Sequence, residues 1–370
     1  MRLFSPQQLA QNAFCPQDYE QLAESYLEKG LFAYLSGGSG QEHSVADNRK
    51  AFQDIQLNSR LLNDVSKGSS EFTLFNQALA APILLAPVAY QNLVDPQGEI
   101  ATAQAANTSG VGSVVSTLSS QSLEKVAQAA PPCKLFQLYL QNDDVANQDL
   151  INRAVEAGYQ AIMITLDTSV QSVSLKARRL GFDLHQQVKA VNLQDYGHNP
   201  GPTGKTLFQS LMTQAPNWQT FGKWIEQSPI PVWVKGVMHP DDAIQLKHMG
   251  VTGIVVSNHG GRALDGSPSP LRVLPAIRKA VGKDFTLLMD SGIRDGYDVF
   301  KALAMGANAV MLGRLQIYAL AVGGAVGVAH MLKLLIEELH LCMALTGCKN
   351  LTDITADKLF IQPTQIQQSL

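Results

Sequence analysis

From residue 82 onward the chain repeats one pattern of hydrophobic and polar positions. A run of five to seven apolar or β-branched residues is followed by a polar or glycine-containing turn, and then by a longer segment with a 3.6-residue period. This alternation predicts parallel strands joined by crossover helices. The predicted strands are residues 82–87, 111–117, 134–140, 161–167, 232–237, 253–257, 286–290 and 309–313. The predicted helices are residues 98–109, 120–129, 144–157, 240–249, 270–281 and 295–305.

Eight parallel strands with connecting helices close most naturally into a (β/α)8 TIM barrel. The alternative is a doubly wound open sheet, which carries a G-x-G-x-x-G turn after its first strand. That turn is absent here. The pattern therefore predicts the α/β class with a TIM barrel.

Segments outside the repeats complete one predicted domain, residues 1–370. Residues 1–75 are predicted to form a helical cap, with helices near 19–29 and 46–52, on a barrel formed by residues 76–340. Residues 341–370 are expected to be a C-terminal tail. After strand four, residues 181–217 contain Gly, Pro, Asn and Gln and no convincing strand. Loops of this length in compact domains are usually functional, so we expect a lid over the active-site end.

Composition and charge exclude several classes of function. With 45% hydrophobic and 16% charged residues, the chain has material for a large core and no signature of disorder. A net charge of −3 gives no field that would attract nucleic acid or an anionic membrane. Glycines, a histidine and a lysine interrupt the apolar stretch 317–336, which favours a buried helix over a membrane span. Four scattered cysteines and no apolar run in residues 1–20 predict a cytoplasmic protein.

Polar residues that end the apolar runs are the candidates for chemistry, because TIM-barrel active sites lie at the C-terminal ends of the strands. Two glycines and two arginines follow strands seven and eight. Backbone N–H groups at Gly292 and Gly313, with charge from Arg294 and Arg314, predict a phosphate site. The alternative is that the glycines serve tight turns and the arginines lie in solvent.

Three other strand ends supply acid–base and electrostatic groups. His259 is a candidate base, Asp167 its orienting carboxylate and Lys235 a stabiliser of negative charge. A lone histidine is more often structural, but Arg262 follows three residues later and favours a catalytic role. An unpaired buried ammonium is costly, so Lys235 is expected to do more than end a strand.

The arrangement resembles the FMN-dependent 2-hydroxy acid oxidase and dehydrogenase family, which includes glycolate, lactate and hydroxymandelate oxidases. The resemblance covers nearly the whole chain. Its most specific element is Ser-Asn-His-Gly-Gly-Arg at 257–262, supported by Val-Lys-Gly at 234–236, Phe-Gln-Leu-Tyr at 136–139 and the turn at 34–37. The glutamine that usually follows the arginine of the motif is Ala263 here.

The resemblance implies roles for individual residues. His259 would remove the proton of the substrate hydroxyl, and Asp167 would stabilise the imidazolium. Arg262 would clamp the substrate carboxylate, and Tyr34 and Tyr139 would add hydrogen bonds to the carboxylate and the hydroxyl, which makes Tyr139 a third catalytic residue. The implied FMN contacts are Pro87, Val88, Ala89, Ser116, Gln137, Thr165, Lys235 and Ser257, and the implied phosphate contacts are Asp290, Gly292, Arg294, Gly313 and Arg314. No metal is implied, and a homotetramer is expected.

Some positions depart from the family. A second active-site arginine is usual seven residues after the aspartate, and that position is Ser174. Lys176, Arg178 or Arg179 would have to replace it, or one carboxylate contact is missing. Apolar residues expected on the substrate side, Leu118, Val88 and Phe208, favour lactate or a larger 2-hydroxy acid over glycolate.

Three functions are compatible with these observations. The first is an FMN enzyme that oxidises an (S)-2-hydroxy acid, with oxygen as the expected acceptor and a quinone or a protein as the alternative. The second is a flavin-dependent isomerase on the same barrel, against which His259 and Arg262 speak. The third is a flavin-binding relic inactivated by Ser174.

Overall fold

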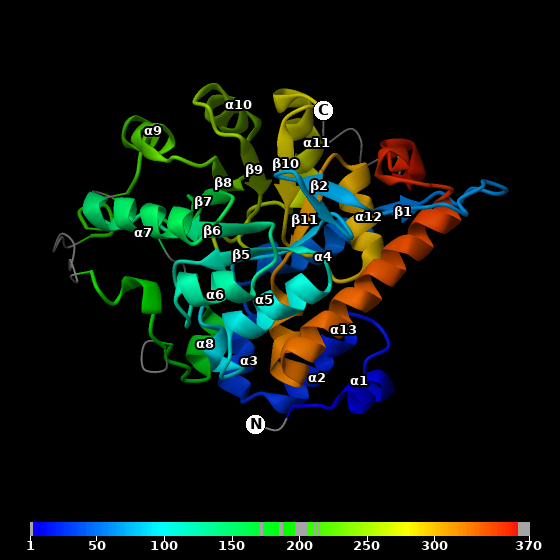
Figure 1. Cartoon of the computed structure of the whole chain (residues 1–370), viewed down its shortest axis with the longest axis horizontal. Helices are drawn as coiled ribbons and strands as arrows, with labels where there is room; N and C mark the ends of the chain where they lie inside the picture. The colour runs from blue at the N-terminus through cyan, green and yellow to red at the C-terminus, as the bar shows by residue number, and fades with distance from the viewer. Residues whose placement is uncertain are drawn as a thin grey trace.

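Eight parallel strands close into a barrel at the centre of the molecule (Figure 1). In this computed structural model, residues 3–170, 173–184, 188–196, 206–210, 212 and 215–361 are described. The barrel strands are β4 (Ile83–Leu85), β5 (Gly112–Ser116), β6 (Lys134–Leu138), β7 (Ala161–Thr165), β8 (Val232–Val237), β9 (Gly253–Val256), β10 (Thr286–Met289) and β11 (Ala309–Leu312). They pair in chain order, and β11 closes the barrel on β4 through Val310 and Ile83. The predicted TIM barrel is confirmed, with one strand in each predicted run.

Helices surround the barrel on the outside. The six predicted helices are present, with ends shifted by at most three residues. They are α5 (Glu99–Thr108), α6 (Leu123–Ala129), α7 (Asp144–Glu156), α10 (Pro240–His248), α11 (Pro270–Val281) and α12 (Gly296–Ala304). Side-chain caps explain several of the starts: Asp143, Ser269 and Asp295 each accept a hydrogen bond from a first-turn N–H.

The N-terminal segment contains four helices and three short strands. The helices are α1 (Pro6–Asn12), α2 (Asp18–Tyr26), α3 (Lys29–Ser36) and α4 (His43–Gln53), and the strands are β1 (Gln56–Leu57), β2 (Phe72–Leu74) and β3 (Gln77–Leu79). Residues 1–75 are therefore not helical throughout. The strands have only two or three residues each, which is too few to show a period of two in the sequence.

The hairpin β2–β3 packs against the apolar interior of the barrel. Its turn places the ring of Phe75 5.3 Å from the ring of Trp233, at the start of β8. Trp233, Leu84, Leu135 and other inward-facing strand residues form one buried cluster with the hairpin. This end of the barrel is filled with apolar side chains, so the polar site lies at the opposite end, where the strands finish.

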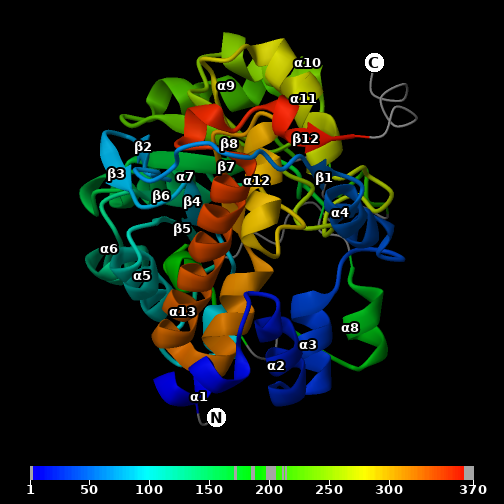
Figure 2. The same ribbon diagram turned by 90° about the vertical axis from the view of Figure 1, so that its right-hand side faces the viewer.

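A long apolar helix, α13 (Arg314–Thr346), follows the last barrel strand. Gly323 and Gly324 have non-helical backbone angles and interrupt it. It is the one helix among the described residues long and apolar enough to cross a membrane, and 61% of its apolar 18-residue stretch is buried inside the protein. It packs against α2, α5 and α12, as Figures 1 and 2 show. The prediction of a buried helical segment at 317–336 is confirmed, with a break that the sequence analysis did not anticipate.

The connection between β7 and β8 contains α8 (Leu175–Arg179), the short 3-10 turn η2 (Val191–Leu193) and α9 (Trp218–Gln227). Helix α8 lies beside α3 in both views (Figures 1 and 2). Residues 185–187, 197–205, 211 and 213–214 of the predicted lid lie outside the described residues. After α13 come two further 3-10 turns, η4 (Leu351–Asp353) and η5 (Ala356–Lys358), and β12 (Leu359–Phe360), which pairs with β1.

Candidate active site

Polar side chains form a continuous network where β5, β6 and β7 end. The hydroxyl of Ser116 donates to Gln137 Oε1 (3.0 Å), and Gln137 Nε2 donates to Thr165 Oγ1 (3.0 Å). All three side chains are buried. They are neighbours because Ser116 pairs in register with Gln137 on the adjacent strand. The network presents both donors and acceptors above the apolar interior of the barrel.

Lys235 extends this polar surface across the end of β8. Its side chain is 4% exposed, and its Nζ lies 3.2 Å from Asp290 Oδ2 and donates to Ser257 Oγ (2.9 Å). Burial alone would lower the pKa of Lys235, but the carboxylates of Asp290 and Asp167 outweigh burial and raise it. Lys235 is therefore a fixed positive charge in the site.

His259 and Asp167 form a hydrogen-bonded pair, although they are far apart in the sequence. His259 Nδ1 lies 2.9 Å from Asp167 Oδ1. Burial would raise the pKa of Asp167, but the charges of His259 and Lys235 hold it below its ordinary value. An ionised carboxylate only accepts, so Nδ1 carries a hydrogen, and in the neutral imidazole the lone pair lies on Nε2.

Tyr139 completes the group around the imidazole. Its hydroxyl lies 3.3 Å from His259 Nε2, and burial raises the pKa of Tyr139 to about 12. The phenol is therefore neutral at physiological pH, with a hydrogen to donate. The structure thus brings together the three residues that the sequence suggested for catalysis.

The backbone turn that carries His259 depends on its glycines. His259, Gly260 and Gly261 have φ values of 59°, 67° and 77° in succession. A side chain at Gly261 would collide with the backbone of Val45 at the start of α4, since its Cβ would lie 2.8 Å from that N atom. The backbone N–H of His259 donates to Ser257 Oγ (3.0 Å), which ties this turn to the residue that follows β9.

Arg262 leads from this turn to the C-terminal end of α3. Its guanidinium donates to the backbone oxygens of Tyr34 and Leu35, the latter at 2.9 Å, and its Cζ lies 5.1 Å from the centroid of the Tyr34 ring. Burial raises the pKa of Tyr34. The Tyr34 ring also stacks on Phe182 beyond α8, with centroids 5.1 Å apart. The predicted carboxylate clamp therefore has two of its members, Arg262 and Tyr34, in direct contact.

Positive charge gathers near the ends of β10 and β11. Burial and the nearby charges of Arg262 and Arg294 lower the pKa of Arg314 to about 10, so the group stays protonated at neutral pH. Arg314 donates to the backbone oxygens of Leu35 (3.2 Å), Gly37 (2.8 Å) and Gly260 (2.8 Å). Arg294 is paired with Glu20 at 3.2 Å.

The other residues of the predicted phosphate site, Gly313, Gly292 and Asp290, have three different surroundings. Gly313 precedes α13 without a side-chain cap, and a Cβ there would meet nothing within 4 Å. Gly292, with φ of 88°, is packed against Asn48 of α4. Asp290 is turned to Lys235 rather than to the arginines.

These features fit FMN. A phosphate would relieve the mutual repulsion of Arg294 and Arg314, and among the described residues the open space at Gly313 lies at the N-terminus of a helix, where anions are favoured. The polar network of Ser116, Gln137 and Thr165 offers the donors and acceptors that the edge of a flavin ring requires. The turn of Pro87, Val88 and Ala89 follows β4 on the same side.

Ser174 does not take the place of an arginine. Its hydroxyl accepts a hydrogen bond from the N–H of Ala177 and caps α8. Lys176 donates to Ser36 Oγ (3.3 Å). Lys176 and Arg179 line a separate groove of ≈ 350 Å³ beside residues 40–42.

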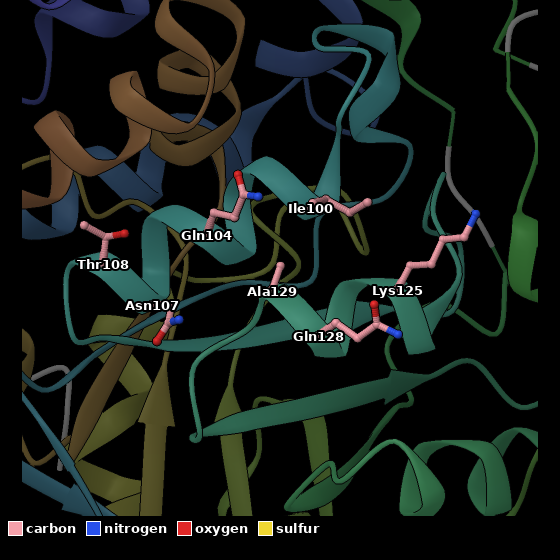
Figure 3. Close-up of a pocket in the computed structure, with 7 residues that line it drawn as sticks. All are labelled: Ile100, Gln104, Asn107, Thr108, Lys125, Gln128 and Ala129. Carbon is pink, nitrogen blue, oxygen red and sulfur yellow. The ribbon is translucent and has the colours of Figure 1, made fainter.

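Of the apolar residues expected near the substrate, two lie at the strand ends and one does not. Val88 and Leu118 are half-buried and follow β4 and β5. Phe208 is 77% exposed, with its side chain on the surface of the described part of the chain. A larger groove, ≈ 610 Å³ between α5 and α6, includes no predicted site residue (Figure 3).

Some residues that hold the site were not found from the sequence. Asn48 and Asn258 exchange two side-chain hydrogen bonds, at 3.0 and 2.8 Å, and tie α4 to the turn that carries His259. Arg49 donates to the backbone oxygen of Gly292 and is paired with Asp298 at 2.6 Å. The motif contained Asn258, but nothing in the sequence connected it with a helix more than 200 residues away.

Comparisons with known proteins agree with this geometry. Residues 23–361 match the family model described as FMN-dependent dehydrogenase. The chain is 49% identical to an L-lactate oxidase of Alicycliphilus denitrificans, over 92% of this chain and 95% of that protein. It is 38% identical to a 4-hydroxymandelate oxidase of Amycolatopsis orientalis, over 90% of this chain and 94% of that protein. A solved structure of a mandelate oxidase variant with (S)-mandelic acid matches 94% of this chain and 98% of that chain, with a TM-score of 0.85 and 36% identity. The chain belongs to the FMN-dependent dehydrogenase family, and its cofactor is FMN.

Proposed function

We propose that the protein oxidises an (S)-2-hydroxy acid, lactate or a larger one, to the 2-oxo acid. The observation that carries the proposal is the His259–Asp167 pair, which leaves Nε2 as a base directed toward Tyr139. An alcohol is oxidised only if its hydroxyl proton and two electrons leave together with the C2 hydrogen. The names of the relatives, a lactate oxidase and a hydroxymandelate oxidase, support this substrate class.

Each candidate residue has a separate role in the proposed reaction. His259 Nε2 accepts the hydroxyl proton, and Asp167 stabilises the imidazolium that forms. Tyr139 donates a hydrogen bond to the substrate oxygen. FMN, when bound, supplies the acceptor for the hydride from C2. Lys235 holds a positive charge in the polar floor of the site, where negative charge develops as electrons arrive.

Arg262 binds the substrate carboxylate in this proposal, and Tyr34 adds a hydrogen bond. In the structure, Nη2 of the guanidinium donates to the backbone oxygens of Tyr34 and Leu35. Only the remaining N–H groups of Arg262 would then bind the substrate carboxylate. Ser174 is uncharged, and its hydroxyl caps α8. We therefore propose a weaker carboxylate clamp than one with two arginines.

The remaining proposals concern the surroundings of the reaction. We propose oxygen as the electron acceptor, which gives hydrogen peroxide; a quinone or a protein acceptor is the alternative. The chain acts as one domain, in a homotetramer, in the cytoplasm. All four cysteines, Cys15, Cys133, Cys342 and Cys348, are free thiols in the structure, which accords with a reducing compartment.

Steady-state oxidation with (S)-lactate, glycolate and (S)-mandelate, each assayed for oxygen uptake and peroxide, tests the proposal. We expect (S)-lactate or (S)-mandelate to exceed glycolate in kcat/KM, with one peroxide formed per 2-oxo acid. Turnover only with a quinone or dye would replace oxygen as the acceptor. A flavin-containing protein with no turnover under either condition would favour the relic.

A further inference from the structure

Glu99 is a buried carboxyl group that the proposed reaction does not use. It is the first residue of α5, and it is only 3% exposed. Its Oε1 accepts hydrogen bonds from the backbone N–H groups of Gln91 and Ser120, both at 3.0 Å. These two residues belong to different loops, so one oxygen atom joins them.

The two loops that Glu99 joins are those that border the site. The first follows β4 and runs from Pro87 to Gln91, and the second follows β5 and contains Leu118 and Ser120. They also touch directly, since the N–H of Tyr90 donates to the Leu118 oxygen (3.1 Å). Tyr90 has a φ of 55°, a strained value for a side chain larger than glycine, so the first loop needs external support to keep its shape.

Neighbouring groups reinforce the same link. Gln91 Nε2 donates to the Val88 oxygen (3.2 Å), and its Oε1 accepts from the hydroxyl of Thr102 on α5. The backbone N–H of Asn92 donates to the Ser120 hydroxyl (3.1 Å), and that hydroxyl donates to Asn92 Oδ1 (2.8 Å). The carboxyl group is thus at the centre of a small buried network that ends at the backbone of Val88.

The position is costly, which argues that it serves a purpose. Among the described residues, Glu99 Oε2 has no hydrogen-bond partner although it is buried. Burial raises the pKa of Glu99 despite the N–H donors. A buried polar atom without a partner destabilises a fold, and an apolar residue of similar size would avoid that cost.

We propose that Glu99 is a positioning residue, which holds the 87–90 turn against the Leu118 loop and so fixes the wall where the flavin and substrate bind. The assignment of this wall rests on the proposed function. Glu99 touches neither the substrate nor the reacting atoms; it acts through the backbone of Gln91 and Ser120.

The test compares Glu99→Gln with Glu99→Met in the FMN-loaded protein. Gln keeps an acceptor for the two N–H groups, whereas Met keeps the volume and removes it. We expect Glu99→Met to weaken FMN binding and to lower kcat with the best 2-hydroxy acid by about tenfold each, since two hydrogen bonds to a carboxylate are lost. KM is expected to change less than kcat, and Glu99→Gln is expected to recover both quantities to within about threefold.

A matched control lies at the other end of the barrel. Asn308 Oδ1 accepts from the backbone N–H of Leu287 at the start of β10 (2.8 Å), so Asn308→Ala removes a comparable link away from the site. It should lower the melting temperature without changing FMN affinity or kcat. The same result for Glu99→Met would overturn the proposal.

A second variant covers the case in which Glu99→Met does not fold. Thr102→Val keeps the carboxyl group and the volume and removes only the donor to Gln91. We expect a smaller change in the same direction, about threefold in FMN affinity; no change would contradict the proposal. FMN affinity can be measured even if no 2-hydroxy acid is oxidised. A failure of the proposed function would therefore be seen as a lack of turnover in the wild type, separately from any effect of the Glu99 variants on FMN affinity.

Discussion

The hydroxyl of Ser174 accepts a hydrogen bond from the N–H of Ala177, 3.3 Å away, and is thereby held at the start of α8. The same oxygen lies only 2.9 Å from where a Cβ on Gly37 would be, so the serine fills the space between α8 and the end of α3. A short capping side chain thus occupies the position at which the family usually has an arginine. In the proposed reaction, the carboxylate clamp then depends on Arg262.

Ser174→Arg tests this dependence. A guanidinium that reaches the substrate carboxylate would add a charged hydrogen bond, so we expect KM for (S)-lactate to fall about tenfold or more. The loss of the cap should lower the free energy of unfolding by about 1 kcal/mol. Ser174→Ala is the matched control, with the same loss of stability and an unchanged KM. An arginine that leaves KM unchanged, in a folded protein, would show that the position does not face the substrate.

His259→Asn removes the proposed base and keeps a side chain that hydrogen-bonds. We expect kcat to fall by about 10²–10⁴, the usual contribution of a positioned general base, with FMN still bound. The rate of flavin reduction in a stopped-flow instrument measures the step directly. A rate within about threefold of the wild type would rule out His259 as the base.

Asp167 predicts a specific dependence of stability on pH. Its pKa is lowered in the fold, so its contribution to stability is complete above the unfolded value, near 3.8, and is lost as the pH falls through the folded value. The difference in free energy of unfolding between wild type and Asp167→Asn should therefore shrink as the pH falls below about 4. Urea titrations at several pH values below about 5 measure it. A difference that grows over this range would mean that the pKa is raised.

Lys235 and Asp290 predict a separation of stability from activity. Lys235→Met leaves the buried carboxylate of Asp290 without its cation and should cost about 3 kcal/mol or more. The double variant Lys235→Met, Asp290→Asn removes both charges, so stability should largely return while the rate of flavin reduction stays low. Recovery of both properties would show that Lys235 has only a structural role.

The barrel and the convergence of the candidate residues at one end of it could be predicted from the sequence because both depend on local patterns. Each strand is a short apolar run, and the residues that end the runs converge wherever such strands close into a barrel. His259 and Asp167 were found in this way, and Tyr139, which the family resemblance added, lies beside them. The arrangement of the phosphate group could not be predicted as well, since the sequence does not show that Asp290 turns to Lys235 or that Gly292 packs on Asn48.

Contacts between distant segments explain most of what was missed. The hairpin Phe72–Leu79 is too short for a visible period, and its role depends on Trp233 in another part of the chain. Glu99 lies in the first turn of α5, where a carboxylate is favourable for local reasons alone, so nothing in the sequence marks it out. Only the three-dimensional structure shows that its oxygen bonds two loops.

The most direct test of the central claim is the visible spectrum of the purified protein during anaerobic addition of a 2-hydroxy acid. We predict that (S)-lactate or (S)-mandelate bleaches the bound flavin and that the (R)-enantiomer does not. The same addition to His259→Asn should bleach it far more slowly. A protein that binds FMN and is bleached by no 2-hydroxy acid, while a chemical reductant does reduce it, would contradict the proposed function.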